Sequence, residues 1–567
     1  MKFDNSNNRL QELIRQYDLL KTKLTTNEYE FRKSITQLEQ NISKKESKIY
    51  ELDNTIKKLI DEKNSLSIFK SSSQKNFNED EVKFREIIQK NSNAELTSLN
   101  LKDQNLEDIH IKYLSQCDFL DNLISLDLRN NPKITNDGFQ YLNLCNFIKK
   151  LSDFKIKLGT RGSRGNEEIS NLSAKFLEKL TDLDLSHLGI NNNGLEILSK
   201  NIYLKNLVSL NLSNNSLSDK GFEFLKDSTV LSNLSILNLS NNKIREIKIE
   251  EYKSLFKLTH FDISENTFKH FPNFQKHFTQ LSTLNLSNNI FTYNYMSVKL
   301  SKLSNLNLSG CKIREGNEEE GFIDLFKHEM FENLVEFNLE ENCLKDLGIK
   351  ELSEYHNLKN LKKIILSSNE INSIGIEYLI SCHFKNITVL DLDDNEIGDK
   401  GIEYLSYCEF KSLTELYLSS NKIGKCGLEF LKYNFKLLSQ LDLSSNIFGD
   451  EGIDILSKCE LKNLTKLNLS SNNIGKAGME FLSRCHFNNL TELDLDNNKI
   501  GKEGMEYLPK CDFKNLAELY LSFTDIGKEG LKCLSKCNFK LLNTLGLSND
   551  IGKGDMESVL NKCDLIF

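Results

Sequence analysis

Tryptophan is absent from this chain of 567 residues, and proline occurs only 3 times. The scarcity of proline excludes long proline-rich linkers and favours continuous regular structure. No run approaches the roughly 18 consecutive apolar residues that a membrane helix needs, and the first residues lack the apolar stretch of a secretory signal. We therefore expect a cytoplasmic protein without a membrane partner, the nucleus not being excluded, whose 13 cysteines are thiols in a reducing compartment.

The charges and motifs also exclude several classes of function. The formal net charge is only −8, and 73 basic residues are interspersed with 81 acidic ones, so nothing points to nucleic acid or an anionic membrane. GTRGSRG at 159–165 resembles a fragment of an Arg-Gly nucleic-acid segment, but it is one short piece of a surface loop expected over 159–168, without an aromatic platform. No phosphate-binding loop, dinucleotide fingerprint, zinc-protease or nucleophile-elbow motif is present. We predict neither an enzyme nor a cofactor, and we do not expect nucleic acid as the partner.

Internal repeats dominate the rest of the chain. Four segments that begin at residues 382, 408, 485 and 511 are each 26 residues long and contain L-x-x-L-x-L-x-x-N or a close variant. Degenerate units keep the same phase, which brings the total to eighteen units with spacings of 22 to 31 residues. The asparagine recurs as Asn131, Asn215, Asn242, Asn266, Asn289, Asn342, Asn369, Asn395, Asn421, Asn446, Asn472 and Asn498, and the degenerate units have Gln104, Gly159, Leu188, Cys311, Thr524 and Asp550 at this position.

Each part of the unit has a mechanical interpretation. Leu416 and Leu418 are two residues apart, so both point into the core from a short strand while Tyr417 points the other way. Asn421 then closes the strand, and its amide can bind backbone groups of adjacent coils. Glycines in the next segment, 423–427, permit a tight turn before apolar residues at helical spacing. This pattern predicts an α/β solenoid, a horseshoe with a parallel sheet on the concave face and helices on the convex face.

The units from residue 94 to residue 567 resemble the ribonuclease-inhibitor-like class of leucine-rich repeats, because they combine N-x-I-G-x-x-G with a helical return. The resemblance implies protein binding without naming a partner, since inhibitors, immune sensors, GTPase activators and actin-binding proteins share this repeat. Units between Asn242 and Cys311 are shorter and lack the I-G-x-x-G step. We therefore expect a change of curvature around residues 242–311.

The N-terminal segment has a different pattern. Apolar residues recur at heptad spacing from Leu10 to Leu66, mostly Ile at a and Leu at d, which favours a parallel two-stranded coiled coil and allows a parallel homodimer or a heterodimer through residues 10–66. We expect a coiled coil over 1–69, then a linker and a capping helix over 70–93, with the helix itself at 81–90. The alternative is a single amphipathic helix that folds against the solenoid. The residues predicted to mediate oligomerisation are Ile35, Leu38, Ile42, Ile49, Leu52, Ile56 and Leu59.

Cysteine recurs at one position of the repeat, after the helix. Successive cysteines are too far apart along the chain for the C-x-x-C pairs of zinc sites. We interpret them as small buried hydrophobic residues and predict no metal site. The cysteines at this position are Cys117, Cys145, Cys382, Cys408, Cys459, Cys485, Cys511, Cys537 and Cys563.

The residues beside the inward leucines should line the concave groove. In the C-terminal half they are mainly acidic, opposed only by Lys363 and Lys466, whereas the N-terminal half has mostly Ser and Asn. Two tyrosines are candidate anchors for a partner, and we predict a partner with a basic surface. The alternative is that these are generic solubilising residues of the repeat. The candidate binding residues are Glu336, Glu340, Glu341, Asp391, Asp393, Asp394, Glu415, Tyr417, Asp442, Glu492, Asp494, Asp496, Glu518 and Tyr520.

These features favour a protein-interaction scaffold or adaptor, in which the solenoid binds the partner and the coiled coil provides oligomerisation or anchoring. Two alternatives remain open. One is a regulator of an enzyme, similar to a GTPase activator or an inhibitor. The other is a structural component of a cytoskeletal or ciliary assembly, which a long coiled coil allows.

Overall fold

The computed structural model describes residues 78–157, 165–170, 175–226, 228–247, 254–271, 278–291, 300–313, 332–354, 358–382 and 384–547. The predicted coiled coil over 1–69, with its oligomerisation residues from Ile35 to Leu59, lies outside the described residues. So do Cys563 and Asp550 itself, although the strand of the Asp550 unit is described.

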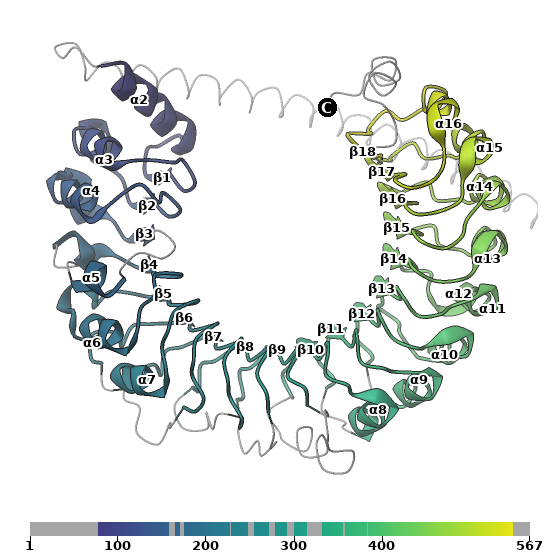
Figure 1. The fold of residues 1–567 in the computed structure, drawn as a ribbon, viewed down its shortest axis with the longest axis horizontal. Helices are drawn as coiled ribbons and strands as arrows, with labels where there is room; N and C mark the ends of the chain where they lie inside the picture. The colour runs from purple at the N-terminus through teal and green to yellow at the C-terminus, as the bar shows by residue number, and fades with distance from the viewer. Residues whose placement is uncertain are drawn as a thin grey trace, which may run out of the picture.

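One parallel sheet of eighteen strands forms the framework of the molecule. Each strand pairs with the next along the chain, and β1 and β18 are the two edges. Figure 1 shows the strands along the inside of an open arc and the helices on its outside. The predicted α/β leucine-rich repeat solenoid with eighteen units is confirmed. The strands are β1 (Ser98–Asn100), β2 (Ser125–Asp127), β3 (Asp153–Lys157), β4 (Asp182–Asp184), β5 (Ser209–Asn211), β6 (Ile236–Asn238), β7 (His260–Asp262), β8 (Thr283–Asn285), β9 (Asn305–Asn307), β10 (Glu336–Asn338), β11 (Lys363–Ile365), β12 (Val389–Asp391), β13 (Glu415–Tyr417), β14 (Gln440–Asp442), β15 (Lys466–Asn468), β16 (Glu492–Asp494), β17 (Glu518–Tyr520) and β18 (Thr544–Gly546).

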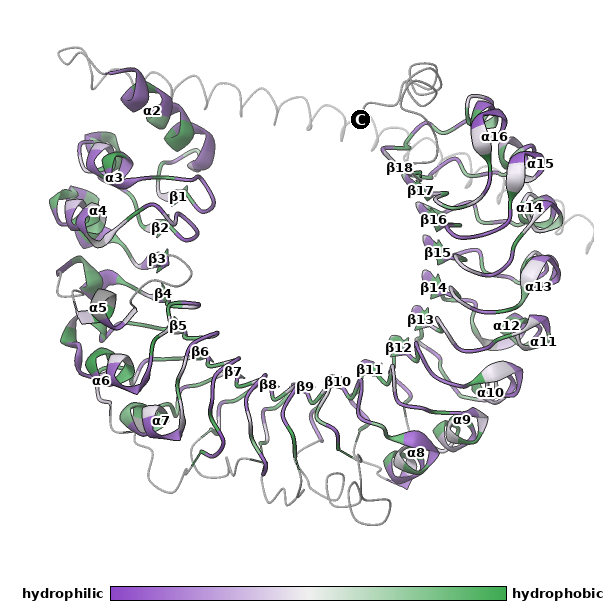
Figure 2. Ribbon diagram, in the orientation of Figure 1, coloured by the Kyte–Doolittle hydropathy of each residue, from purple (hydrophilic) through white to green (hydrophobic). Residues whose placement is uncertain are grey.

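Helices follow most strands and cover the convex side. Figure 2 shows that they have both hydrophobic and hydrophilic residues, as expected for elements with one buried face. The α-helices are α2 (Glu79–Asn91), α3 (Asp108–Leu114), α4 (Asn136–Gln140), α5 (Gly165–Ser170), α6 (Asn192–Lys200), α7 (Asp219–Lys226), α8 (Lys345–Glu354), α9 (Ser373–Leu379), α10 (Gly398–Leu405), α11 (Lys425–Leu428), α12 (Leu431–Asn434), α13 (Gly449–Leu456), α14 (Lys476–Leu482), α15 (Gly501–Met505) and α16 (Gly527–Leu534). The 3-10 helices are η1 (Asp118–Leu120), η2 (Tyr141–Leu144), η3 (Asn146–Lys150), η4 (Lys175–Lys179), η5 (Ile202–Leu204) and η7 (Leu508–Lys510).

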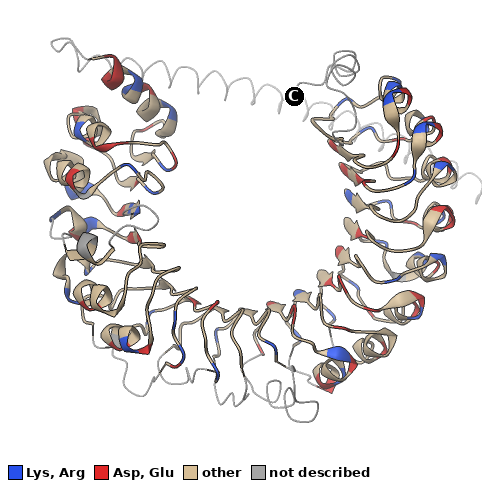
Figure 3. Ribbon diagram, in the orientation of Figure 1, with Lys and Arg blue, Asp and Glu red and all other residues tan. Residues whose placement is uncertain are grey.

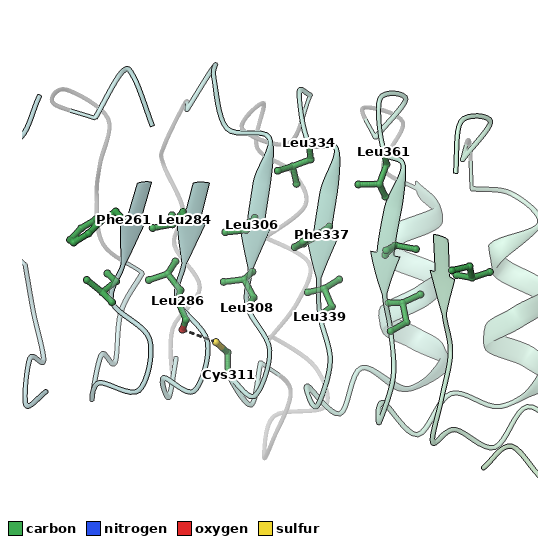
Figure 4. Packing of buried hydrophobic residues seen from close by; sticks show 14 of the residues in the cluster. Phe261, Leu284, Leu286, Leu306, Leu308, Cys311, Leu334, Phe337, Leu339 and Leu361 are labelled. Atoms are coloured by element: carbon green, nitrogen blue, oxygen red, sulfur yellow. Dashed lines mark hydrogen bonds between the residues drawn. The ribbon is translucent and has the colours of Figure 1, made fainter. Parts of the chain in front are cut away.

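The two-residue period of the strands separates the core from the groove. Leu416 and Leu418 are both 0% exposed, whereas Glu415 and Tyr417 between and beside them are half-buried on the other face. Burying one leucine side chain contributes roughly 2 kcal/mol, and the pattern recurs in nearly every unit. Figure 4 shows the resulting core, in which leucines and phenylalanines of successive strands, such as Leu306 and Phe337, point to the same side. The predicted assignment of strand faces is confirmed.

Buried asparagines tie the units together after each strand. The Asn446 Nδ2 donates to the carbonyl oxygens of Leu418 (2.9 Å), Leu443 (3.0 Å) and Ser444 (3.1 Å). Its Oδ1 accepts from the backbone N–H groups of Asn421 (3.1 Å) and Ile423 (2.9 Å) in the preceding unit. One side chain thus satisfies backbone groups of two coils that burial would otherwise leave unpaired. The predicted role of the asparagine is confirmed.

Glycine is required where one coil approaches the next. A Cβ atom at Gly427 in α11 would lie 2.8 Å from Asp399 Oδ1 and 3.0 Å from Ile423 Cγ2. Any larger side chain would separate α11 from α10, which explains the glycine of the I-G-x-x-G step.

The first unit is covered by α2, a helix where the sequence predicts one at 81–90. Phe84 and Ile88 of this helix are buried. The Phe84 ring meets the His110 ring of α3 edge-on, with centroids 5.2 Å apart, and Asn78 Nδ2 donates to Tyr113 Oη at 2.9 Å. The helix therefore shields the apolar edge of the array, as a terminal cap must.

The middle of the array lacks helices in the part that the structure describes. Between α7 and α8 the described residues form β6 to β10 and no helix. The sheet nevertheless continues with parallel pairing through all five strands, and the change of curvature expected around 242–311 stays a prediction. One smaller expectation is wrong: the loop predicted over 159–168 ends earlier, because α5 begins at Gly165.

Candidate protein-binding surface

The candidate binding residues lie on β10 to β17 or directly after these strands. The register places them in rows that cross the sheet, with Glu336, Glu415, Glu492 and Glu518 in one row and Asp391, Tyr417, Asp442, Asp494 and Tyr520 in the next. Glu340, Asp393 and Asp496 follow two residues after their strands, whereas Glu341 and Asp394 occupy the turns with φ of +54° and +51°. We call this surface the acidic face; Figure 3 shows acidic positions, in red, on the strands along the inner side of the arc.

Several of these carboxylates have a structural task that does not require charge. Asp391 Oδ1 accepts from the backbone N–H of Asp393 (3.1 Å), and Asp494 Oδ1 accepts from that of Asp496 (2.9 Å). Asn211 makes the same contact with Ser213 N at 3.0 Å, as does Asn238 with Ser240 N at 2.8 Å. Because a neutral amide closes the strand equally well, the fold does not explain the negative charge.

Tyrosine replaces this closing residue in β13 and β17. Tyr417 cannot accept from the Ser419 N–H as the side chain of an aspartate or asparagine would. The Ser419 N–H instead donates to Asp393 Oδ1 of the preceding unit at 2.6 Å. The Ser522 N–H after Tyr520 donates in the same way to Asp496 Oδ1 at 2.5 Å. Each tyrosine is thus accompanied by an aspartate that satisfies the backbone group left without its usual acceptor.

The tyrosine hydroxyls bind glutamates of the same strand. Tyr417 Oη donates to Glu415 Oε2 at 3.0 Å, with Gln440 Oε1 at 3.2 Å, and Tyr520 Oη donates to Glu518 Oε2 at 2.7 Å. Burial and Glu415 raise the pKa of Tyr417, and the hydrogen bond to Glu518 raises the pKa of Tyr520 to about 12. Both phenols therefore stay protonated and act as hydrogen-bond donors and aromatic contact surface.

The carboxylates of the acidic face lie close enough to repel one another. Burial, reinforced by Asp391, raises the pKa of Asp393 to about 7. Burial also raises the pKa of Asp494 to about 6, and Asp496 adds to this shift. Lys466 forms an ion pair with Glu492 at 2.6 Å, but it does not reverse these shifts. A cationic group of a partner placed here would reduce the repulsion and restore the charged carboxylates.

The N-terminal strands differ from the sequence-based expectation of mostly Ser and Asn. That expectation holds on β5 and β6, but β2 to β4 contain charges that neutralise each other. Arg129 binds Asp127 at 2.7 Å, and Lys157 binds Asp184 at 3.3 Å. The concave surface therefore changes along the arc from paired charges through mostly neutral residues, with Asp262 on β7, to the acidic face.

Phe523 is a candidate contact residue that the sequence analysis missed. Its side chain is 66% exposed and its φ is +55°, an unfavourable conformation for a bulky residue. It lines a surface recess of about 630 Å³ beside Asn497 and Thr524. The signal in the sequence is an aromatic residue at the turn position where the preceding units have Ser420, Ser471 or Asn497.

The recurrent cysteines that the structure describes lie in or against the core. Cys117, Cys145, Cys408 and Cys485 are buried, and Cys485 Sγ contacts the carbonyl oxygen of Phe481 at 3.7 Å. Burial raises the pKa of the Cys485 thiol to about 12. These thiols are therefore protonated at neutral pH and suit packing rather than chemistry.

Thiol labelling with Ellman's reagent at pH 8 should reflect this burial. Cys426 is exposed, so we expect it to react at least roughly 100-fold faster than Cys485, whose thiolate is scarce and inaccessible. Mass spectrometry of the labelled peptides would separate the two sites, with guanidinium-unfolded protein as the control in which both react. Equal rates in the folded protein would contradict the buried placement of Cys485.

Comparison with known proteins agrees with this fold. The family profile described as "Leucine Rich repeat" matches residues 203–225, 385–406, 411–432, 460–483, 487–508 and 514–535, and the profile "Leucine Rich Repeat" matches residues 233–255. The chain is a leucine-rich repeat protein. No curated protein matches it. Its assignment to the ribonuclease-inhibitor-like class stays a prediction.

Two solved structures illustrate the similarity. An internalin from Listeria monocytogenes has a TM-score of 0.41 and 22% identity, over 62% of this chain and 92% of that one. The complex of TLR13 with ssRNA13 has a TM-score of 0.46 and 17% identity, over 80% of this chain and 66% of that one. None of the helices in the described part of the chain has the length and apolarity needed to span a bilayer.

Proposed function

We propose that this chain is a non-enzymatic, cytoplasmic protein-binding scaffold whose acidic face binds a partner with a basic surface. Leucine-rich repeat arrays in general present extended concave surfaces to protein partners. The observation that supports the partner's charge is the presence of Asp391, Asp442 and Asp494 where Asn211 and Asn238 close the strand without charge. Selection for the fold alone would not favour repelling carboxylates at these places.

The N-terminal segment supplies the second half of the proposal. A parallel homodimer through residues 10–66 would join two acidic faces in one assembly, which increases apparent affinity for a multivalent partner. Its support is the heptad spacing of residues such as Ile42, Ile49 and Leu52.

Neutralising the strand-closing aspartates should weaken binding without unfolding the chain. The variant combines Asp391→Asn, Asp442→Asn and Asp494→Asn, because asparagine keeps an acceptor oxygen for the strand-closing bond. For a purified partner captured by the wild-type chain, we expect about a tenfold weaker Kd at low salt and a shallower dependence on ionic strength. Fluorescence anisotropy at several salt concentrations measures both quantities.

The matched control neutralises three acids on convex helices, Asp454→Asn in α13, Glu480→Gln in α14 and Glu503→Gln in α15, and so changes the net charge equally. Binding should be nearly unchanged in this control. Affinity that is indifferent both to ionic strength and to the groove variant would refute the acidic face as the binding surface.

A further inference from the structure

The acidic face contains one arrangement of side chains twice. Each residue of the first group has a counterpart of the same type in the second, at the same separation along the chain and at the same place in the strand register. The first copy is Lys363, Asp391, Asp393, Glu415 and Tyr417 on or after β11 to β13, and the second copy is Lys466, Asp494, Asp496, Glu518 and Tyr520 on or after β15 to β17.

The contacts of the aspartates and tyrosines are also the same in the two copies, whereas the lysines differ, because Lys466 pairs with Glu492 and the strand position beside Lys363 is Val389. Asp393 and Asp496 each accept the N–H of the serine that follows the tyrosine, at 2.6 and 2.5 Å. Both tyrosines donate to the glutamate of their own strand, at 3.0 and 2.7 Å. Even the adjoining turns correspond, because Ser368 Oγ donates to Asp394 Oδ2 (3.0 Å) and Asn497 Nδ2 donates to Ser471 Oγ (2.9 Å). The chain therefore repeats a geometry, not only a composition.

The repeat itself does not demand this arrangement. Among the eighteen described strands, only β13 and β17 end in tyrosine. Introducing that tyrosine removes the strand-closing acceptor, and in both copies an aspartate in the preceding unit accepts from the freed N–H. The tyrosine and its aspartate thus depart from the other units together, and they do so in the same way in both copies. Such a shared departure is expected if the two copies recognise the same chemical group.

We propose that the two copies are equivalent sites that together bind one extended protein segment with two clusters of basic side chains. This inference rests on the proposed binding of a basic partner by the acidic face. In each copy a Lys or Arg side chain of the partner can meet the carboxylates and lie against the tyrosine ring, which adds a cation–π contact.

The spacing of the copies sets the spacing in the partner. Tyr417 and Tyr520 occupy equivalent places in β13 and β17, four strand steps apart. At about 4.8 Å per step this separation is roughly 19 Å, which an extended segment crosses in about six residues. The partner segment should therefore repeat its basic cluster about every six residues as it follows the groove across the strands.

Synthetic peptides test this spacing on the full chain. The first peptide contains a single Arg-Lys-Arg cluster, and the second contains two such clusters with centres six residues apart in a Ser-rich background. The third peptide has the same two clusters with centres three residues apart. Its charge equals that of the second peptide, but its clusters are too close together to reach both copies at once. Isothermal titration calorimetry gives the stoichiometry and Kd of each.

We expect the single-cluster peptide to bind at two sites per chain. The six-residue spacing should bind one to one, and about 100-fold more tightly than the three-residue spacing, because the second contact becomes intramolecular. Neutralising either copy should reduce the six-residue peptide to about the affinity of the single cluster. The first-copy variant is Asp391→Asn, Asp393→Asn and Glu415→Gln, and the second-copy variant is Asp494→Asn, Asp496→Asn and Glu518→Gln.

The outcomes separate this inference from the proposed function. If the wild-type chain binds the six-residue and the three-residue peptides with equal affinity, the paired sites are overturned. This comparison uses the wild-type chain alone, so it does not depend on the folding of any variant. If the peptides bind but neutralising both copies has no more effect than the convex control (Asp454→Asn, Glu480→Gln, Glu503→Gln), the acidic face itself is not the binding surface. No binding of any peptide at low salt would overturn both.

Discussion

Asn446→Ala should lower the free energy of unfolding by about 3 kcal/mol. The amide of Asn446 donates to three backbone carbonyls and accepts from the N–H groups of Asn421 and Ile423. Alanine provides none of these contacts, and the backbone groups that lose their partner stay buried. Each buried backbone group left unpaired costs about 1–3 kcal/mol before relaxation reduces the sum. Urea unfolding followed by far-UV circular dichroism measures the loss.

Two further variants show whether the hydrogen bonds are the cause. Asn446→Thr should lose less, because Thr524 occupies the equivalent position while buried, with its hydroxyl donating to the carbonyl oxygen of Leu521 at 2.5 Å. Asn488→Ala, at an exposed site, should change stability by no more than about 0.5 kcal/mol. A loss for Asn446→Ala as small as that of Asn488→Ala would show that the asparagine ladder does not hold the coils together.

The ladder and the strand faces were predictable from the sequence because both depend on short-range geometry that recurs. The alternation of Leu416, Tyr417 and Leu418 fixes which side chains are buried, whatever the neighbouring coil contains. Repetition then removes the ambiguity that a single short apolar run would have. The same reasoning placed α2 over the first unit, because an exposed apolar edge requires a cover.

Contacts between units were not predictable in the same way. The hydrogen bond from Ser419 N to Asp393 Oδ1 joins two strands, so it depends on their register and on a particular rotamer. The ion pair of Lys157 with Asp184 likewise requires neighbouring strands to be aligned, so the mutual neutralisation of the charges on β2 to β4 depends on the register. Phe523 was not predicted because it stands at a turn position where other units have serine or asparagine. The repeat pattern therefore gives no reason to expect an aromatic side chain there.

Asp393→Asn should stabilise the protein at pH 8 and, by linkage, only about 40% as much at pH 5. Burial, together with repulsion from Asp391 and then Asp442, raises the pKa of Asp393 from 3.8 to about 7. Between these values the folded state binds more protons than the unfolded state, so the penalty from this group is absent below about pH 4 and complete above about pH 7. Asparagine cannot become charged, yet it keeps an oxygen that can accept from Ser419 N.

We expect a gain of about 2 kcal/mol at pH 8, after reduction for the partial solvation of this half-buried group. Urea unfolding of wild type and variant at both pH values isolates the effect of Asp393 and of the carboxylates that interact with it, since the titrating groups elsewhere cancel in the difference. Asp454→Asn on α13 serves as the control and should differ little from wild type at either pH. Equal stability of Asp393→Asn and wild type at pH 8 would mean that the carboxylate is charged there without penalty. A gain that increases with pH, accompanied by weaker binding of basic peptides, would mean that this charge is retained for recognition at the expense of the fold.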